Sequence, residues 1–258
     1  MSVFDRVSKP ADRAVMATIF GDSGMGKTSL ACTFPNPIVI RGEDGLQAIP
    51  ADRRPDAFPL LTTSDELWEQ LRGLITEKHD YKTVIVDSIT ALERMFVNEI
   101  VASDPKKPRS VNQALGGYGA GMEAVAQMHM RVKKAATLLI DRGMHVVFVA
   151  HAEVEHIELP DTDGFDRYSM RLGKKSIGIY LDESDLVGYI SLETFTRKGD
   201  ADNAKAKAIS TGERMLTCHA VAANRSKNRY GITEPLPVVI GVNPLTGYIP
   251  TLQPAQSE

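Results

Sequence analysis

The chain has 258 residues, of which 43% are hydrophobic and 24% charged, and its formal net charge at pH 7 is −3. This length is sufficient for one domain with a sizeable core, and the small negative charge excludes a protein that coats nucleic acid by bulk charge. The two cysteines, Cys32 and Cys218, form no metal-ligand pair, which favours a reduced, cytoplasmic protein. No apolar run approaches membrane-spanning length, so we expect no membrane association.

A phosphate-binding loop is the strongest motif in the chain. The stretch Gly21-Asp22-Ser23-Gly24-Met25-Gly26-Lys27-Thr28 fits the pattern G-x-x-x-x-G-K-[ST] at every fixed position. An apolar strand over residues 14–20 is expected before it, and a short helix that Pro35 ends is expected after it. These flanks disfavour an accidental glycine-rich turn. The predicted nucleotide-binding residues are Gly21, Asp22, Ser23, Gly24, Met25, Gly26, Lys27, Thr28 and Ser29.

The residue types in this loop suit ATP and Mg²⁺. Three glycines let the backbone fold around an anion with its N–H groups pointing inward, and the N-terminus of the following helix adds a positive partial charge. Lys27 would reach the β- and γ-phosphates, and the Thr28 hydroxyl would bind Mg²⁺.

The predicted organisation is one domain over residues 14–250, with a flexible lead-in at 1–13 and a disordered tail at 251–258. A second buried strand from Pro37 should bring the carboxylates Glu43 and Asp44 to one edge of the sheet. The alternative is that these two residues form only a polar turn. Residues 48–59 are predicted to be a surface loop, and Thr63 with Glu66 predicts a capping box at the start of a helix in which Trp68 is core packing.

A third strand, Lys82-Thr83-Val84-Ile85-Val86, runs directly into Asp87. This is the Walker B arrangement, in which a strand-end carboxylate holds the Mg²⁺ water shell beside the phosphate loop. The competing interpretation is that Asp87 caps the next helix. A phosphate loop upstream favours the Walker B role.

The middle of the chain contains a further strand that ends in a polar residue. Residues 103–121 are basic and glycine-rich and form either a functional loop or a solvated linker, and a helix should follow over 122–140. The strand His145 to His151 then ends beside the expected γ-phosphate. His151 is therefore predicted to sense that phosphate, although a histidine there can also be an ordinary hydrogen-bonded neighbour.

Residues 160–176 lack clear periodicity and are rich in cations. We predict that they contact single-stranded DNA, with backbone-phosphate contacts from basic side chains and base stacking on one aromatic ring; the alternative is a solvated charged loop. The predicted DNA-binding residues are Tyr168, Arg171, Lys174 and Lys175.

The last third of the chain should return to the sheet. Strands are expected at 185–190 and 215–219, a hairpin-like excursion at 197–212, and an edge strand at 238–240. Between them, Lys227 and Arg229 are two residues apart in an extended segment, so their side chains point the same way. No carboxylate partner is evident nearby in the sequence, which suggests an anion elsewhere; a surface pair that aids solubility or touches DNA is the alternative.

Together these features resemble the RecA-like ATPases. The resemblance rests on the phosphate loop, Gly42-Glu43-Asp44-Gly45, Asp87, His151 and Lys227-Asn228-Arg229, and it runs from about Ala14 to Pro237. It is strongest to the short, core-only members encoded by bacteriophages, the AAA-type ATPases grouped with Sak-type single-strand annealing proteins. Modules for oligomerisation and DNA gathering, found in full recombinases, are not recognisable here.

The resemblance implies an α/β P-loop NTPase with a RecA-like core, in which a mostly parallel central sheet is flanked by helices on both faces. It implies a Mg²⁺-dependent ATPase that acts on single-stranded DNA in phage recombination or annealing, inside the bacterial host cell. ATP would bind between subunits of a homo-oligomeric ring or filament, with a single-strand DNA-binding protein as a further partner. Glu43 would orient the attacking water, and Lys227 and Arg229 would act on the neighbour's ATP.

Two other functional classes stay open on the residues alone. A nucleotide-controlled switch would use ATP only to regulate assembly. A P-loop small-molecule kinase would need an arginine lid, for which Arg167 and Arg171 are candidates. Hydrolysis itself requires Mg²⁺, a positive charge on the phosphates and an oriented water. Thr28 and Asp87 could hold the Mg²⁺, Lys27 could supply the charge, and Glu43 could orient the water.

Overall fold

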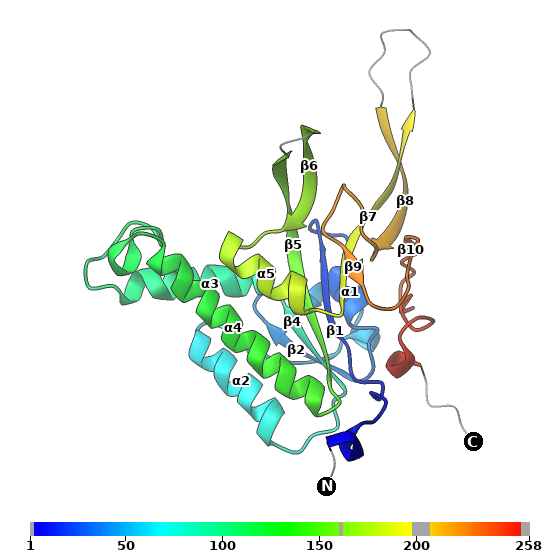
Figure 1. The fold of residues 1–258 in the computed structure, drawn as a ribbon, viewed down its shortest axis with the longest axis horizontal. Helices are drawn as coiled ribbons and strands as arrows, with labels where there is room; N and C mark the ends of the chain where they lie inside the picture. The colour runs from blue at the N-terminus through cyan, green and yellow to red at the C-terminus, as the bar shows by residue number, and fades with distance from the viewer. Residues whose placement is uncertain (1–2, 160–161, 198–206, 254–258) are drawn as a thin grey trace.

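The protein folds around one twisted sheet. The computed structural model describes residues 3–159, 162–197 and 207–253. In these ranges the strand order along the sheet is β10-β8-β7-β1-β5-β4-β2-β3, with β6 paired to β5 and β9 to β7 (Figure 1). The strands are β1 (Met16–Gly21), β2 (Pro37–Arg41), β3 (Asp56–Leu60), β4 (Thr83–Asp87), β5 (His145–Leu159), β6 (Thr162–Met170), β7 (Leu186–Arg197), β8 (Lys207–Thr217), β9 (Lys227–Asn228) and β10 (Leu236–Pro237).

The centre of the sheet is parallel and buried. β1 pairs in parallel with both β5 and β7, and β4 pairs in parallel with β5 and β2. Every residue of β1 and β4 is buried, as expected for strands covered on both faces. The carboxyl ends of β1, β2, β4 and β5 therefore meet at one edge, where their polar residues come together.

Helices cover the two faces unequally. Leu67 of α2, Phe96 of α3, Val132 of α4 and Tyr180 of α5 belong to the apolar cluster on one face. On the other face, Leu30 of α1 packs with the C-terminal segment. This arrangement confirms the predicted α/β fold class. The helices are α1 (Lys27–Ala31), α2 (Ser64–Thr76), α3 (Ile89–Ser103), α4 (Ala120–Asp141) and α5 (Lys174–Glu183), and the short 3₁₀ turns are η1 (Val3–Arg6), η2 (Leu46–Ala48), η3 (Ala51–Arg53), η4 (Ala114–Gly116) and η5 (Pro250–Leu252).

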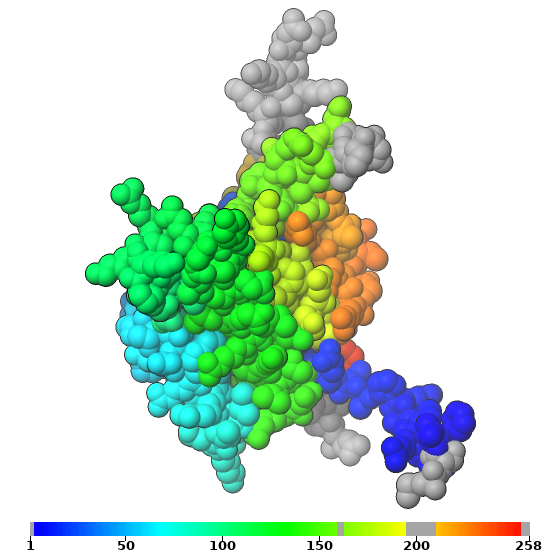
Figure 2. Space-filling model, turned by 60° about the vertical axis from the view of Figure 1, so that its left-hand side comes forward, coloured from blue at the N-terminus to red at the C-terminus, as the bar shows by residue number. Residues whose placement is uncertain are grey.

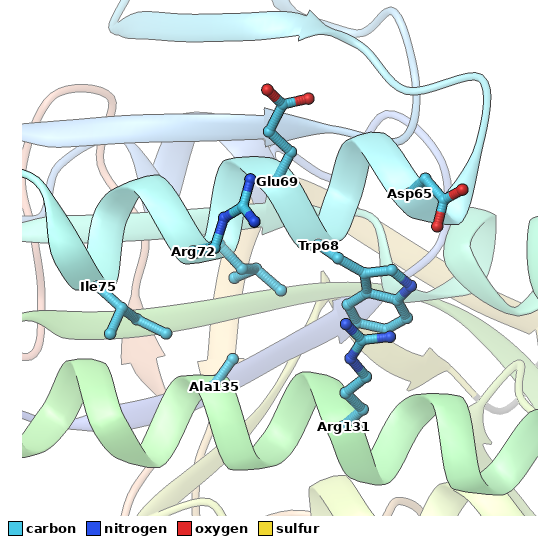
Figure 3. A pocket seen from close by; sticks show the side chains of 8 residues that line it. Asp65, Trp68, Glu69, Arg72, Ile75, Arg131 and Ala135 are labelled. Carbon is cyan, nitrogen blue, oxygen red and sulfur yellow. The ribbon is translucent and has the colours of Figure 1, made fainter.

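The helix α2 begins and packs as its sequence predicts. The Thr63 side chain accepts from the Glu66 backbone N–H, and the Glu66 carboxylate accepts from the Thr63 backbone N–H, which completes the capping box. Trp68 stacks on Phe96 with ring centroids 5.9 Å apart, and the Arg131 guanidinium lies 4.1 Å above the Trp68 ring. Figure 3 shows this contact at the open groove between α2 and α4. None of the helices in the described ranges has the length and apolar character needed to cross a bilayer.

Four predicted segments differ in the structure. Residues 48–59, expected to be a surface loop, contain most of the edge strand β3, and residues 160–176, expected to be irregular, contain most of the hairpin strand β6 and the start of α5. The second edge strand is Leu236–Pro237 instead of 238–240. The start of the predicted tail is folded, because Leu252 is buried in the apolar cluster next to Leu245 and Ile249. The expected excursion at 197–212 is a β7–β8 hairpin, although 198–206 lies outside the described residues.

Several parts of the chain project from this body, among them the described strands of the β7–β8 hairpin (Figure 1). Figure 2 shows residues 3–13 standing away from the domain, and all of them are exposed. The β5–β6 hairpin extends beyond the carboxyl edge of the sheet, and its base lies next to the phosphate loop (Figure 1).

Candidate nucleotide-binding site

The phosphate loop joins the end of β1 to the start of α1. Gly24 and Gly26 have φ angles of 78° and 87°, which residues other than glycine rarely adopt. Gly21 is required for a different reason. A side chain at this position would come within 2.4 Å of the Ile190 backbone oxygen, because β1 packs tightly against β7. These glycines allow a turn whose backbone N–H groups can surround an anion.

Lys27 lies inside this turn. Its side chain is buried, and its Nζ donates to the Asp22 carbonyl oxygen at 2.8 Å. Burial lowers the pKa of Lys27, and the nearby carboxylates of Asp87 and Glu43 oppose that shift. The loop thus holds a cation where a phosphate would enter.

Thr28 and Asp87 meet beside the loop. The Thr28 hydroxyl donates to Asp87 Oδ2 at 2.7 Å, and Asp87 is buried at the end of β4. Burial raises the pKa of Asp87, while the bond from Thr28 acts against this. The cap of α3 is Ser88, whose Oγ accepts from the Ala91 N–H, and the Asp87–Ser88 peptide is cis. The alternative that Asp87 caps α3 is therefore wrong. The carboxylate oxygens of Asp87 and the hydroxyl oxygen of Thr28 fit a hydrated Mg²⁺.

Glu43 faces the same space, and Asp44 does not. Glu43 accepts a hydrogen bond from Ser88 Oγ at 2.8 Å and from Arg94 at 3.0 Å, and its Oε2 lies 3.1 Å from His151 Nε2. The hydrogen bonds with His151 and Ser88, together with the nearby charge of Arg94, lower the pKa of Glu43 to about 2, and burial only partly opposes this. Asp44 is exposed and forms an ion pair with Arg41.

His151 connects the two sides of the site. Its backbone N–H donates to Thr90 Oγ1 at 3.0 Å, and its ring Nδ1 lies 3.4 Å from Ser23 Oγ in the phosphate loop. On the other side, its backbone oxygen accepts from the Arg171 N–H at 2.8 Å. The imidazole therefore touches both the loop and Glu43, while the same residue is bonded to the base of the β5–β6 hairpin.

These residues line one open cavity of about 520 Å³, which is within the range of small-molecule sites. The cavity has a second wall that sequence analysis missed, formed by Arg214 of β8 and the segment 238–241. Neither belongs to a motif, and both are about 200 residues from the loop in the sequence. The signal in the sequence was the apolar run Val238-Val239-Ile240, which predicted an edge strand and not a cavity wall.

The four predicted DNA-binding residues lie near this site but do not form one free basic surface. Tyr168 stacks on Tyr189 with centroids 4.8 Å apart, so one of its faces is covered. Arg171 donates to the Ala152 carbonyl oxygen, and Lys175 pairs with Glu123 at 2.8 Å. Lys174 is exposed at the start of α5. They remain predictions as DNA contacts.

Lys227 and Arg229 are placed apart from the other predicted residues. Lys227 pairs with Val187 at the amino end of β7, whereas the phosphate loop follows the carboxyl end of the parallel strand β1. The expectation that they lack local partners is wrong: Arg229 pairs with buried Asp185 at 3.0 Å, and Lys227 donates to the Asp182 carbonyl oxygen. Asp185 was hidden from sequence reasoning because it lies 44 residues before Arg229. A role in a neighbouring subunit stays a prediction.

Comparison with known proteins identifies the family. An AAA domain family matches residues 13–230. The chain belongs to this family. The SPbeta prophage-derived uncharacterized protein YorG of Bacillus subtilis (strain 168) is 24% identical over 180 residues, which are 67% of this chain and 50% of YorG. The chain thus spans about half the length of this curated relative.

Among solved structures, the chain is similar to the KaiC-like protein PH0186 from the archaeon Pyrococcus horikoshii OT3. The TM-score is 0.45 and the sequence identity 11%, over 90% of this AAA domain protein and 88% of PH0186.

Proposed function

We propose that this AAA domain protein is a Mg²⁺-dependent ATPase of RecA-like type that acts on single-stranded DNA. The observation that carries the catalytic part is the convergence of Lys27, Thr28, Asp87, Glu43 and His151 from four different strand ends on one cavity. Lys27 would bind the β- and γ-phosphates. Mg²⁺, held by Thr28 and Asp87, would neutralise charge on the phosphate oxygens.

The ionised Glu43 carboxylate is suited to accept a hydrogen bond from a water and so to orient it. Its low pKa favours the form that can accept a hydrogen bond, and its contact with His151 fixes its position. Since the His151 ring also lies beside Ser23 and its backbone oxygen is bonded to Arg171, a change in loop contents would reach Glu43 and the hairpin base through a single residue.

The DNA part of the proposal is supported by the surroundings of His151. The chain leaves the site there as the β5–β6 hairpin, and Arg171 at its return is bonded to His151, so a change in loop contents would reach the start of this basic segment. The prophage origin of YorG supports a phage setting for recombination or annealing. The kinase alternative has less support, because both lid candidates are engaged: Arg167 pairs with Glu155 at 2.7 Å, and Arg171 donates to the Ala152 carbonyl oxygen.

The first test is ATP turnover by the purified protein with and without single-stranded DNA, across protein concentration. We expect Mg²⁺-dependent hydrolysis that DNA stimulates, and we expect Lys27→Ala to abolish it because the phosphates lose their point charge. Wild-type turnover in a folded Lys27→Ala protein would contradict the site. Turnover that DNA leaves unchanged would remove the DNA part and retain the ATPase.

A further inference from the structure

The second wall of the nucleotide cavity carries a cation close to the phosphate loop. Arg214 lies on β8, and its guanidinium reaches over the phosphate loop. Its Nη2 is 3.5 Å from the Gly24 carbonyl oxygen, and its Nη1 is 3.6 Å from the point where a Cβ on Gly26 would stand. It lines the same cavity as Lys27 and Thr28.

Arg214 lies beside the phosphate loop without an anionic partner among the described residues. Within the described ranges, no carboxylate lies at ion-pair distance from its guanidinium, and its contact with Gly24 is long for a hydrogen bond. Arginines that do reach a carboxylate include Arg13, Arg41, Arg94, Arg167, Arg225 and Arg229. A partly buried guanidinium beside an anion-binding loop is well matched to phosphate, which it can bind through two parallel hydrogen bonds.

The backbone holds this side chain in place. The pairing of β7 with β8 shifts between Leu192 and Thr194, and Gly212 in the shifted stretch has a φ of 82°. Such an irregularity bends a strand and changes where its side chains point. Directly after it, Arg214 is paired with Leu192 on one side, and its carbonyl oxygen accepts from the Val238 N–H at 2.8 Å on the other.

We propose that Arg214 is a phosphate-binding residue that acts on the nucleotide of its own subunit. The proposal rests on the proposed ATPase function and adds a second cation to its site. In the sheet, β8 and β7 lie on one side of β1, and β5, β4 and β2 lie on the other. The triphosphate would therefore be held between Arg214 on one flank and Asp87 and Glu43 on the other, with Lys27 below it.

The test is equilibrium binding of a fluorescent ATP analogue, with ATP and inorganic tripolyphosphate as competitors. Arg214→Ala should weaken ATP by about tenfold or more, as loss of a charge-assisted hydrogen bond does. Tripolyphosphate should weaken by the same factor, since the contact is to phosphate and not to the base. The affinity of Arg214→Lys for ATP should lie between those of the wild type and Arg214→Ala, because lysine keeps the charge and loses the two parallel hydrogen bonds of the guanidinium. Arg72→Ala, on the exposed surface of α2, is the matched control.

The outcomes distinguish the role of Arg214 from the proposed ATPase function. If the wild type binds no nucleotide, the proposed function fails. If the wild type binds and Lys27→Ala does not, yet Arg214→Ala matches the wild type, only the Arg214 assignment fails. A folded Arg214→Ala protein that loses ATP but keeps tripolyphosphate affinity would also overturn it, because the effect would then be on the base.

A mixing experiment tests whether Arg214 acts within its own subunit. Arg214 and Lys27 would serve the same site, so co-assembled Arg214→Ala and Lys27→Ala proteins contain no site with both residues. We expect no recovery of ATP turnover in the mixture beyond the sum of the two variants. Recovery would show that Arg214 reaches a neighbour's nucleotide and would overturn the assignment.

Discussion

Glu43 is held by contacts with Ser88, Arg94 and His151, and this environment determines how it should behave. Glu43→Gln keeps the shape of the side chain but removes its basicity, so we expect ATP binding to be nearly unchanged and hydrolysis to fall by about 10²–10⁴. Single-turnover hydrolysis together with nucleotide binding would measure both effects. Asp44→Asn is the matched control, because Asp44 pairs with Arg41 outside the cavity.

The pH dependence follows from the same contacts. The pKa of Glu43 is lowered to about 2, so its carboxylate is ionised throughout pH 5–8 and should cause no acid limb in the rate over that range. Its stabilising contacts are fully present above the ordinary pKa of a glutamate and are lost as the pH falls towards 2. For the substitution experiment, a loss of hydrolysis in Asp44→Asn and not in Glu43→Gln would contradict the assignment of Glu43 as the residue that orients the water.

At the residue scale, the sequence predicted the site residues that belong to a short continuous motif and not those that depend on contacts between distant segments. Lys27 and Thr28 belong to one short motif, and Asp87 ends an apolar run, so each could be found without knowing the fold. Arg214 and Asp185 could not be found this way. Each acquires its role from a neighbour that is brought close only by strand pairing, across 190 residues for Arg214 and Gly24.

At the scale of elements, the β5–β6 hairpin and the start of α5 follow His151 and carry the predicted DNA-binding residues. Replacing Arg171, Lys174 and Lys175 together by alanine should weaken binding of single-stranded DNA for all sequences. The slope of log affinity against log salt should flatten by about 0.7 per lost phosphate contact. Fluorescence anisotropy of a labelled oligonucleotide over a salt series measures both quantities.

The control for this experiment removes the same charge from another surface. Arg72, Lys78 and Lys82 are exposed residues at or after α2, and their triple alanine variant also removes three positive charges. If both triple variants lose the same affinity, the effect is one of net charge. Unchanged affinity and slope in the Arg171, Lys174 and Lys175 variant would mean that this surface is a solvated charged segment.

The two missed strands show why element prediction failed where it did. β3 contains Pro59 and carries no clean alternation, and proline is accepted there because β3 is an edge strand. In β6, none of residues 163–168 is buried, so most of this strand needs no apolar face. By contrast, β1 and β4 are buried on both faces and are apparent as apolar runs.

At the scale of the whole molecule, Lys227 and Arg229 test whether the site is completed by a neighbour. Arg229→Ala should fold, because Asp185 keeps its second partner, Arg13, at 2.8 Å. We expect this variant to bind ATP and to hydrolyse it poorly, since an arginine supplied by a neighbouring subunit can contribute about 10³–10⁵ in rate. Wild-type turnover per subunit should also rise with protein concentration.

Mixing Arg229→Ala with Lys27→Ala should restore part of the activity, because each variant supplies the half that the other lacks. Co-assembly has to be shown in the same samples, for example by light scattering with a tagged subunit. Full activity of Arg229→Ala alone would show that the pair with Asp185 is only structural. The absence of recovery in a mixture that co-assembles would lead to the same conclusion.

The pairing of β1 also has a consequence for how the protein is made. β1 is synthesised early, but Met16 pairs with Val146 and Ala17 pairs with Leu186, so both of its sheet partners are synthesised much later. At about 5–20 residues per second, this segment waits on the order of ten seconds for its first partner. Contacts so distant in sequence also slow folding. Nucleotide can therefore assist folding only late, once most of the chain has left the ribosome.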